Sequence, residues 1–390
     1  MKASPGIQDS IELRFSELAR EMNARGAKII SLGLGEPEFP TPPEVISAAH
    51  QAMLDGMTRY SNPFGLTSLR NRIARKLNEE NNIDAEADEI LVAPGAKMAL
   101  SLALGAILHP GDEIINVTPC YPSYVPQVKI AEPNATVRNI DLTKPDLQLD
   151  IDSIGEALNE NTRAILINFP HNPTGRILDS NVLDHLIELI KDHHCFLISD
   201  EIYERLIFGS TVHVSPGSRP ELEGRVITVN GFSKAFSMTG WRVGYLHVSN
   251  REIMQTISRL QQHMNTNTAP FSQFAALTAL GLSTDFLESY NTSLGINNDM
   301  LYQLAKASPN LEFSPGEGGL FAFLDISATG KTSDQFATEL LERYTVALIP
   351  GIAFGKNWDD HVRISLAIDS KTFNKGMSRL GEYVGALRAA

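Results

Sequence analysis

The sequence predicts an α/β fold with a mainly parallel sheet, and three observations favour it. Short apolar runs alternate with helical patterns through the middle of the chain, as strands and crossover helices do in parallel sheets. The chain has 390 residues, of which 43% are hydrophobic and 20% charged, a composition typical of a globular protein with a large core. Both ends of the chain lack this alternation, which indicates a second, smaller region.

Six apolar runs are predicted to be buried strands, and they span 89–92, 113–117, 164–168, 196–199, 226–229 and 243–248. Patterns between them, such as those at 98–108 and 182–191, predict helices. In open α/β sheets, ligands bind outside the carboxyl ends of the strands. We therefore expect the functional side chains at these strand ends.

The two ends of the chain are expected to form one small domain. Residues 9–25 predict a helix, followed by a loop rich in Gly and Pro. After residue 285 the pattern predicts a long helix, strands near 321–326 and 362–366, and a final helix from Ser370. The predicted domains are a large one over 47–285 and a small one that combines 1–46 with 286–390.

Composition also limits the possible partners. Acidic residues outnumber basic ones by 46 to 33, for a net charge of −13, which argues against nucleic acids and anionic membranes. Two cysteines, Cys120 and Cys195, exclude a disulfide scaffold and favour a reducing compartment. No apolar run reaches the ~18 residues of a membrane span, and the N-terminus has no apolar signal core. We expect a cytoplasmic protein.

The most informative segment is Gly-Phe-Ser-Lys-Ala-Phe-Ser-Met-Thr-Gly-Trp-Arg-Val-Gly at 231–244, directly after a predicted strand. Lys234 lies between apolar segments, where desolvation favours a neutral amine that can form a Schiff base. Arg242 offers a planar guanidinium suited to a phosphate. Taken alone, Lys234 fits a solvated loop lysine better than a functional one.

Further polar residues stand at predicted helix and strand ends. Gly95 opens a helix in Ala-Pro-Gly-Ala-Lys, where free N–H groups suit an anion. Asn172, in Phe-Pro-His-Asn-Pro-Thr-Gly, follows one strand, and Asp200 and Tyr203, in Ser-Asp-Glu-Ile-Tyr, follow another. Each also has a purely structural interpretation, as a helix start, a turn or an N-cap.

In this order, Asn-Pro-Thr-Gly, Ser-Asp-Glu-Ile-Tyr and Gly-Phe-Ser-Lys with Gly-Trp-Arg resemble the class I/II aminotransferases, in particular their bacterial aspartate aminotransferase subgroup. The resemblance runs from Leu-Gly-Leu-Gly-Glu-Pro at 32–37 to His-Val-Arg-Ile-Ser at 361–365. It implies fold type I of the PLP-dependent transferases, with an α/β/α large domain, a smaller α+β domain, and pyridoxal 5′-phosphate (PLP) as cofactor. It also implies ping-pong transfer of an amino group between an L-amino acid and a 2-oxo acid.

The resemblance assigns residues around the PLP ring. Lys234 matches the Schiff-base lysine, and Asp200 matches the carboxylate that pairs with the pyridine nitrogen and keeps the ring an electron sink. Asn172 and Tyr203 match the pair that hydrogen-bonds the phenolic oxygen. Tyr121 matches the aromatic residue stacked on the ring. Lys234, Asp200 and Tyr203 are the implied catalytic residues.

At the phosphate, the resemblance implies contacts from Gly95, Ala96, Lys97, Ser233 and Arg242. Several relatives have hydroxyl side chains where this chain has Ala96 and Lys97, so backbone donors and Arg242 would contribute more here. Tyr60 matches a tyrosine that reaches the phosphate of the neighbouring subunit. This match implies a homodimer with shared active sites.

At the substrate, Arg363 matches the arginine that holds the α-carboxylate, a task suited to a bidentate guanidinium. Gly35 matches a glycine beside that carboxylate, and Asn172 lies at the same place. The Lys97 side chain could meet a distal carboxylate, which would favour aspartate or glutamate as donor; alternatively it balances phosphate charge or is solvated. Arg14 is a second candidate for the distal carboxylate.

Other functions share part of this pattern. A PLP-dependent lyase, such as a carbon–sulfur β-lyase or an aminocyclopropane-carboxylate synthase-like enzyme, would also carry Lys234, Asp200 and Arg363. A transcriptional regulator would need a DNA-binding module, but the roughly 30 residues before Gly33 predict a single helix. No metal site is expected, because His193, His194 and Cys195 are consecutive and lack a partner cluster.

Overall fold

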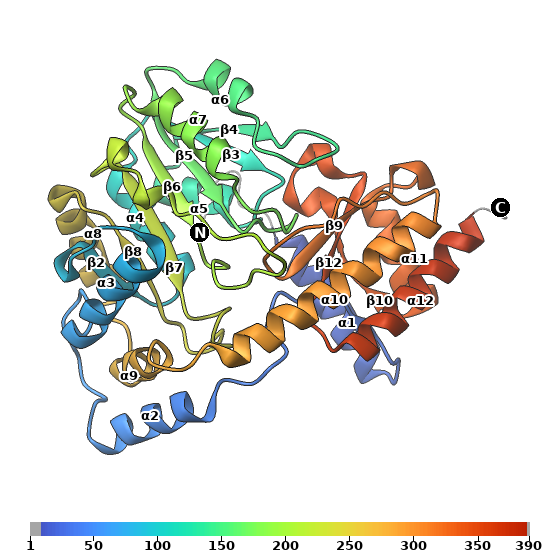
Figure 1. The fold of residues 1–390 in the computed structure, drawn as a ribbon, viewed down its shortest axis with the longest axis horizontal. Helices are drawn as coiled ribbons and strands as arrows, with labels where there is room; N and C mark the ends of the chain where they lie inside the picture. The colour runs from blue at the N-terminus through green and yellow to red at the C-terminus, as the bar shows by residue number, and fades with distance from the viewer. Residues whose placement is uncertain (1–8, 388–390) are drawn as a thin grey trace.

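The computed structural model describes residues 9–387, and its largest element is a seven-stranded sheet (Figure 1). In spatial order the strands are β2 (Ile90–Ala93), β8 (Gly244–His247), β7 (Val226–Gly231), β6 (Phe196–Asp200), β5 (Thr162–Asn168), β3 (Glu113–Thr118) and β4 (Thr136–Asp141). Strand β8 runs antiparallel to both of its neighbours, and the remaining pairs are parallel. This arrangement confirms the predicted α/β class.

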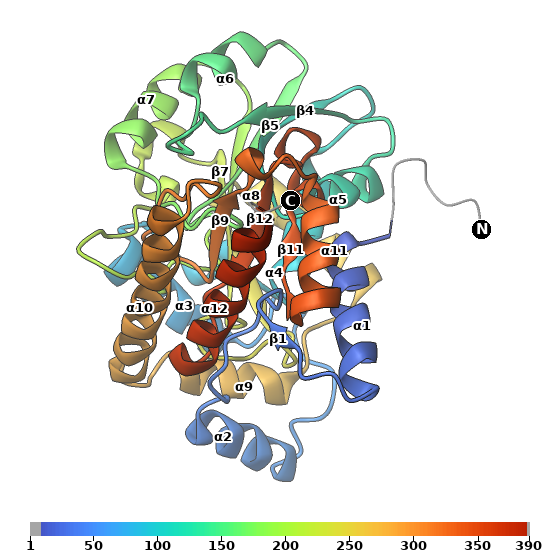
Figure 2. The same ribbon diagram turned by 90° about the vertical axis from the view of Figure 1, so that its right-hand side faces the viewer.

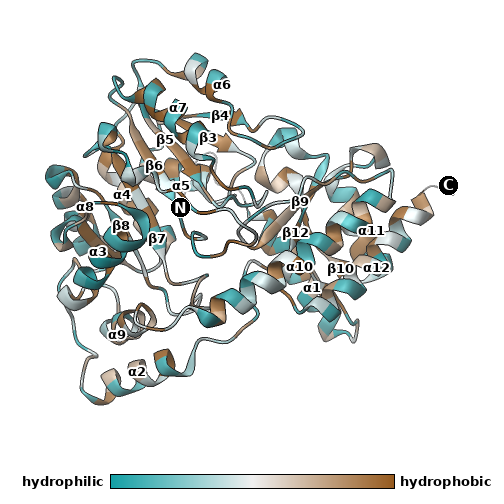
Figure 3. Cartoon of the chain, viewed as in Figure 1, coloured by the Kyte–Doolittle hydropathy of each residue, from teal (hydrophilic) through white to brown (hydrophobic). Residues whose placement is uncertain are grey.

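Side chains on the central strands alternate between two cores. In β5, Ile165 and Ile167 pack into one hydrophobic cluster, whereas Ala164 and Leu166 pack into the other. Because side chains alternate along a strand, a strand buried on both faces has a continuous apolar sequence. Figure 3 shows these strands in brown between helices that carry teal outer faces.

Helices cover both faces of the sheet. One face packs on α4 (Ala96–Ile107), α5 (Tyr124–Ala131) and α8 (Arg251–Met264). The other packs on α3 (Thr67–Asn81), α6 (Ile151–Ala157), α7 (Ser180–Ile190) and α9 (Pro270–Ala279). Helix α2 (Pro43–Leu54) lies beside α9 in both ribbon views (Figures 1 and 2).

A second region contains the C-terminal elements and the first helix (Figure 2). Its antiparallel sheet has the order β11 (Ile349–Pro350), β12 (His361–Ser365) and β9 (Phe321–Asp325), and β1 (Ile30–Ser31) pairs in parallel with β10 (Val346–Ala347). The helices are α1 (Ile11–Ala24), α10 (Asp285–Ala307), α11 (Ser333–Tyr344) and α12 (Ser370–Leu387). Short 3-10 turns span Ala87–Glu89, Pro216–Ser218, Pro220–Leu222, Ser327–Thr329, Gly351–Phe354 and Lys356–Trp358.

The predicted elements are present with small shifts of their ends. All six predicted strands of the large sheet form, and the predicted terminal helices correspond to α1 and α12. Strand β4 was missed because it is a polar edge strand, with Thr136, Arg138 and Asn139 on its exposed positions. Pairing with β3 holds it in place without an apolar pattern. The domain boundaries at residues 46 and 285 stay a prediction.

Within residues 9–387, none of the helices combines the length and the apolar content that crossing a bilayer requires.

Candidate active site

A pocket of about 430 Å³ lies at the carboxyl ends of the central strands. It collects Gly35, Ala96, Lys97, Tyr121, Asn172, Asp200, Tyr203, Ser233, Lys234, Arg242 and Arg363, all of which the sequence had predicted as site residues. Strands β5, β6 and β7 deliver several of them at their ends, as the position of ligand sites in parallel sheets predicts. Strands β9 and β12 add Phe321 and Arg363 from the second region.

Three predicted residues, Gly95, Tyr60 and Arg14, lie outside the pocket lining. Gly95 stands one residue before α4, in direct contact with the Arg242 side chain. Tyr60 is 87% exposed and does not line the pocket of its own chain. Arg14 is also exposed and pairs with Asp334 instead of entering the pocket.

Lys234 follows β7 and points into the pocket. Its Nζ donates a hydrogen bond to the carbonyl oxygen of Gly35 at 2.5 Å. Burial lowers the pKa of Lys234 to about 8, with a smaller lowering from the positive charges of Arg363 and Arg242, while Glu36 and Glu12 act in the opposite direction. A substantial share of this amine is therefore neutral near pH 8, as a nucleophile or base requires.

Asp200 ends β6 and is buried. Its Oδ2 accepts from the Tyr124 hydroxyl at 2.8 Å and its Oδ1 from the backbone N–H of Ile202 at 3.3 Å. Burial nevertheless raises the pKa of Asp200 to about 6, since these hydrogen bonds offset only part of the desolvation. A cation beside this carboxylate would lower that pKa again, so Asp200 fits a protonated ring nitrogen.

Asn168 ties the ends of β5 and β6 together. Its Nδ2 donates to the carbonyl oxygen of Asp200 at 2.7 Å, and its Oδ1 accepts from the backbone N–H of Asn172 at 2.9 Å. Tyr203 is buried against the edge of Phe321, with ring centroids 6.0 Å apart, and burial raises the pKa of its hydroxyl. The hydroxyl therefore stays protonated and can donate a hydrogen bond.

The opposite end of the pocket is built for an anion. Gly95 has φ +88°, and a Cβ at this position would overlap the Arg242 guanidinium. A Cβ on Gly244 would overlap the backbone of Ala96. Both glycines thus let Arg242 approach the start of α4, whose first N–H groups have no intrahelical acceptor. Guanidinium, helix start and the nearby Ser233 together fit a phosphate group.

Arg363 on β12 is 2% exposed and forms a third polar part of the pocket wall, besides those around Asp200 and Arg242. Its Nη2 donates to the carbonyl oxygen of Gly33 at 2.9 Å and its Nη1 to Oδ1 of Asn172 at 3.2 Å. The rings of Phe321 and Phe354 lie against the guanidinium, with centroids 4.0 and 4.9 Å from Cζ. Its Nη1 also lies 2.6 Å from Oε1 of Glu12.

Lys97 projects from the first turn of α4 into the pocket. Its Nζ stands 5.3 Å from the centroid of the Tyr121 ring, within the range of a cation–π contact. Tyr121 in turn packs its edge against Tyr124, with centroids 5.5 Å apart. The Lys97 ammonium and the Arg363 guanidinium are therefore two cations in one pocket.

Sequence reasoning missed Glu12, Tyr124 and Phe321 as residues of the pocket. Glu12 stands in the first turn of α1, where an acidic residue is common because the helix dipole stabilises a negative charge there. Phe321 begins a strand and resembled an ordinary core residue. Tyr124 lies within the Pro-Cys-Tyr-Pro-Ser-Tyr segment that supplied Tyr121, and its position three residues later, across the turn that leads into α5, is the pattern that could have identified it.

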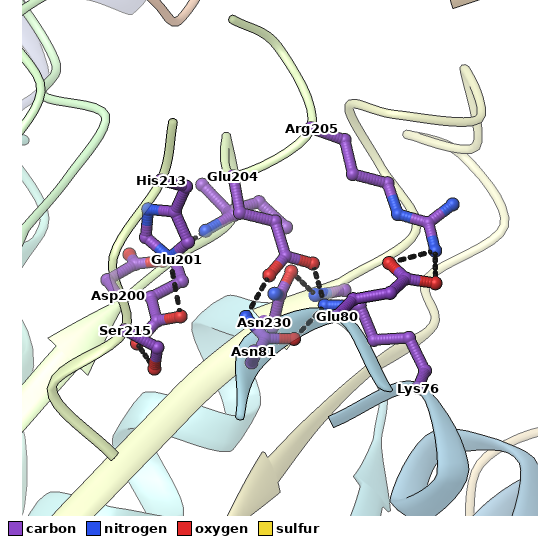
Figure 4. A network of polar contacts seen from close by, with 12 residues as sticks. Lys76, Glu80, Asn81, Asp200, Glu201, Glu204, Arg205, His213, Ser215 and Asn230 are labelled. Atoms are coloured by element: carbon purple, nitrogen blue, oxygen red, sulfur yellow. Dashed lines mark hydrogen bonds and ion pairs between the residues drawn. The ribbon is translucent and has the colours of Figure 1, made fainter. Parts of the chain in front are cut away.

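A separate polar network lies directly behind Asp200 (Figure 4). Glu201 accepts from His213 Nε2 and from Ser215 Oγ, both at 2.8 Å. Glu204 pairs with Lys76 and accepts from Asn81 Nδ2 at 2.7 Å. Ligand atoms of Glu201, Glu204 and His213 lie within 4.8 Å of one another, but each carboxylate oxygen already accepts a hydrogen bond, so this cluster is an ion-pair network.

Comparison with known proteins gives a consistent result. Residues 27–380 match the family model of aminotransferase class I and II. The chain is 32% identical to an aspartate aminotransferase of Geobacillus stearothermophilus over 99% of this chain and 98% of that protein. An aspartate aminotransferase from Thermus thermophilus, solved with maleate, superimposes with a TM-score of 0.91 at 32% identity, over 96% of this chain and 97% of that one. An aromatic aminotransferase from Pyrococcus horikoshii superimposes with a TM-score of 0.89 at 32% identity, over 95% and 100% of the two chains.

Proposed function

The chain belongs to the class I and II aminotransferases, and from this premise we propose that its preferred amino donors are acidic, aspartate or glutamate. The family match and the similar proteins confirm three predictions from the motifs: the resemblance to this family, the fold and the cofactor. The activity is PLP-dependent transfer of an amino group between an amino acid and a 2-oxo acid. Nothing in the comparisons favours the lyase alternative.

The cofactor supplies an electron-withdrawing ring that carries the amino group between two substrates. We propose that Lys234 attaches the cofactor and, once the substrate amine has released it, moves the proton at the substrate Cα. Its lowered pKa supports both tasks. Asp200 is proposed to hold the ring nitrogen in its protonated form, and Tyr121 to stack on the ring.

The remaining ring and phosphate contacts follow from the geometry of the pocket. Asn172 and Tyr203 are proposed to donate to the phenolic oxygen of the cofactor, since both line the pocket beside Asp200. The phosphate is proposed to bind Arg242, Ser233 and the N–H groups at the start of α4. The glycine at position 95 supports this assignment, because any side chain there would separate Arg242 from the helix start.

One observation supports the acidic preference: the pocket holds two cations that suit two carboxylates. Arg363 is proposed to hold the α-carboxylate, with Gly35 beside it, and the Lys97 ammonium to attract the distal one. The Thermus relative was solved with maleate, which carries two carboxylates. Relatives at the same identity are named for aspartate and for aromatic substrates. The choice of amino donor must therefore be inferred from the pocket and not from the overall similarity.

Lys97→Ala tests this preference. We expect kcat/KM for aspartate to fall. The loss should correspond to roughly 1.5–3 kcal/mol of transition-state stabilisation, the range for a charged hydrogen bond, with little change for alanine. Lys306→Ala serves as a control, because Lys306 is an exposed lysine at the end of α10. Equal losses on aspartate and alanine would assign Lys97 to the cofactor and remove the support for an acidic donor.

Assembly and location are also proposed. We propose a homodimer in which Tyr60 of each chain reaches the phosphate site of the other. Its 87% exposure outside its own pocket supports this arrangement, as does a hollow of about 630 Å³ that Arg242 and Thr239 share with the active-site pocket. The free, buried Cys120 and Cys195 support a reducing, cytoplasmic location.

A further inference from the structure

An internal carboxylate contacts the arginine that is proposed to hold the substrate. Oε1 of Glu12 lies 2.6 Å from Nη1 of Arg363, and the two side chains are 20% and 3% exposed. Glu12 also lines the active-site pocket, together with Leu13 and Ser16 from the same helix. No motif of the family match led to this residue.

The contacts of Arg363 leave little room for a second carboxylate. Nη2 donates to Gly33, and Nη1 is shared between Asn172 and Glu12. Nε is buried and has no hydrogen-bond partner among the described residues. The rings of Phe321 and Phe354 lie against the guanidinium, and Glu12 Oε1 lies 2.6 Å from Nη1, so an incoming carboxylate competes with Glu12 for this side of Arg363.

The position of Glu12 is fixed by its helix. Phe15 and Ala19 bury one side of α1 in the core of the second region, and the hydroxyl of Ser10 caps the helix by accepting from Leu13. Arg363 itself is buried, and a buried cation without a counter-ion is strongly destabilising. Glu12 supplies that counter-ion from a partly exposed position, from which it can rotate away.

We propose that Glu12 limits the affinity of this aminotransferase for both of its substrates, as an internal competitor for the position of the substrate α-carboxylate. Each substrate carboxylate must displace Glu12 before Arg363 can bind it. The amino acid and the 2-oxo acid both carry a carboxylate next to the reacting carbon, so the competition weakens both by a similar factor. This inference rests on the proposed role of Arg363.

The test compares Glu12→Gln and Glu12→Ala with the wild-type holoenzyme. We expect KM to fall by roughly tenfold for the amino donor and for the 2-oxo acid, the effect of removing one charge-assisted competitor. We expect kcat to change less than about threefold, because Glu12 contacts neither the reacting carbon nor Lys234, and burial has a larger effect on the Lys234 pKa than the charge of Glu12 has. Glu17→Gln is the matched control, because it removes the same charge from an exposed position of α1.

A second measurement does not depend on turnover. Isothermal titration calorimetry with succinate, an unreactive dicarboxylate, should show a dissociation constant roughly tenfold lower in Glu12→Gln than in wild type or Glu17→Gln. Succinate should also raise the melting temperature of Glu12→Gln more than that of wild type, because it replaces the missing counter-ion of Arg363. If Glu12 had a purely structural role, its substitution would lower stability without lowering the succinate dissociation constant.

Unchanged KM values and an unchanged succinate dissociation constant in both Glu12 variants would overturn the proposal, provided that Arg363→Gln abolishes succinate binding. If Arg363→Gln binds succinate as wild type does, Arg363 is not the carboxylate site. That result would overturn the proposed function of Arg363, and the role of Glu12 with it.

Discussion

Asp200 and Glu201 are neighbours in the sequence, yet they belong to two regions that differ in how their charges are paired. Asp200 faces the pocket, where no carboxylate of residues 9–387 lies within ion-pair distance of Lys97, Lys234 or Arg242. Glu201 faces the network of Figure 4, where its two oxygens are bound by His213 and Ser215 and Glu204 is paired with Lys76. Three of the pocket charges lack a protein partner, whereas the charges of the network have one.

The pKa shifts follow this division. In the pocket, burial moves groups towards neutrality: it lowers the pKa of Lys234 to about 8 and raises that of Asp200 to about 6. In the network, pairing favours the charged forms. Burial alone would raise the pKa of Glu204 and lower that of His213, but Lys76 and Glu201 outweigh it, so the pKa of Glu204 falls and that of His213 rises. Burial thus favours the neutral forms of Lys234 and Asp200 in the pocket, whereas pairing keeps the groups of the network charged.

The largest expected effect is on the pocket lysine. Lys234→Ala should reduce turnover by at least about 10⁴-fold, because the chain loses both the cofactor attachment and the proton carrier at Cα. The variant should keep its fold, because within residues 9–387 the lost side chain makes one hydrogen bond, to Gly35. Steady-state assays and circular dichroism check both points; transamination at the wild-type rate would remove Lys234 from the chemistry.

Asp200→Ala should come second. Without a charge partner for the ring nitrogen, the rate of proton transfer in a single turnover should fall by about 10²–10⁴-fold. Cofactor binding should persist, since the phosphate contacts are untouched. Asp192→Ala, at an exposed position, provides the control in rapid-mixing experiments, and an unchanged single-turnover rate in Asp200→Ala would contradict its assignment.

The network should respond in stability. Glu204→Gln leaves the buried Lys76 without its counter-ion, and breaking a buried pair in this way costs about 3–5 kcal/mol of unfolding free energy. The double variant Lys76→Met with Glu204→Gln should recover part of that loss, because no unpaired charge remains. Urea denaturation measures both. A Glu204→Gln protein as stable as wild type would show that the network carries little stability.

The smallest expected effect is a pH dependence from His213. Glu201 and Glu204 raise its pKa in the folded state above the usual value, against burial and Lys76. A raised pKa stabilises the fold fully below the unfolded pKa of about 6.5, and this contribution disappears as pH rises through the folded pKa. The stability difference between wild type and His213→Gln should therefore be largest below about pH 6.5 and shrink as the pH rises above it. A difference that stays constant or grows with pH would contradict a charged His213.

Much of the pocket was predictable from the sequence, because its residues stand at strand ends in recognisable segments. Asn172, Asp200 and Lys234 each follow a strand whose apolar pattern identified it. What could not be predicted depends on long-range packing. The pairing of Glu12 with Arg363 joins residues from opposite ends of the chain, and no local pattern encodes it. The network behind Asp200 likewise depends on α3 lying beside the loop after β6.

The central claim is that two cations of the pocket, Arg363 and Lys97, serve the carboxylates of an acidic substrate in a transamination. The most direct measurement mixes the purified holoenzyme with single amino acids in the absence of any acceptor. We predict one equivalent of 2-oxo acid per active site, no continuing release of ammonia, and a faster half-reaction with aspartate or glutamate than with alanine. Ammonia that continues to accumulate beyond one equivalent, or a faster reaction with alanine, would contradict this account.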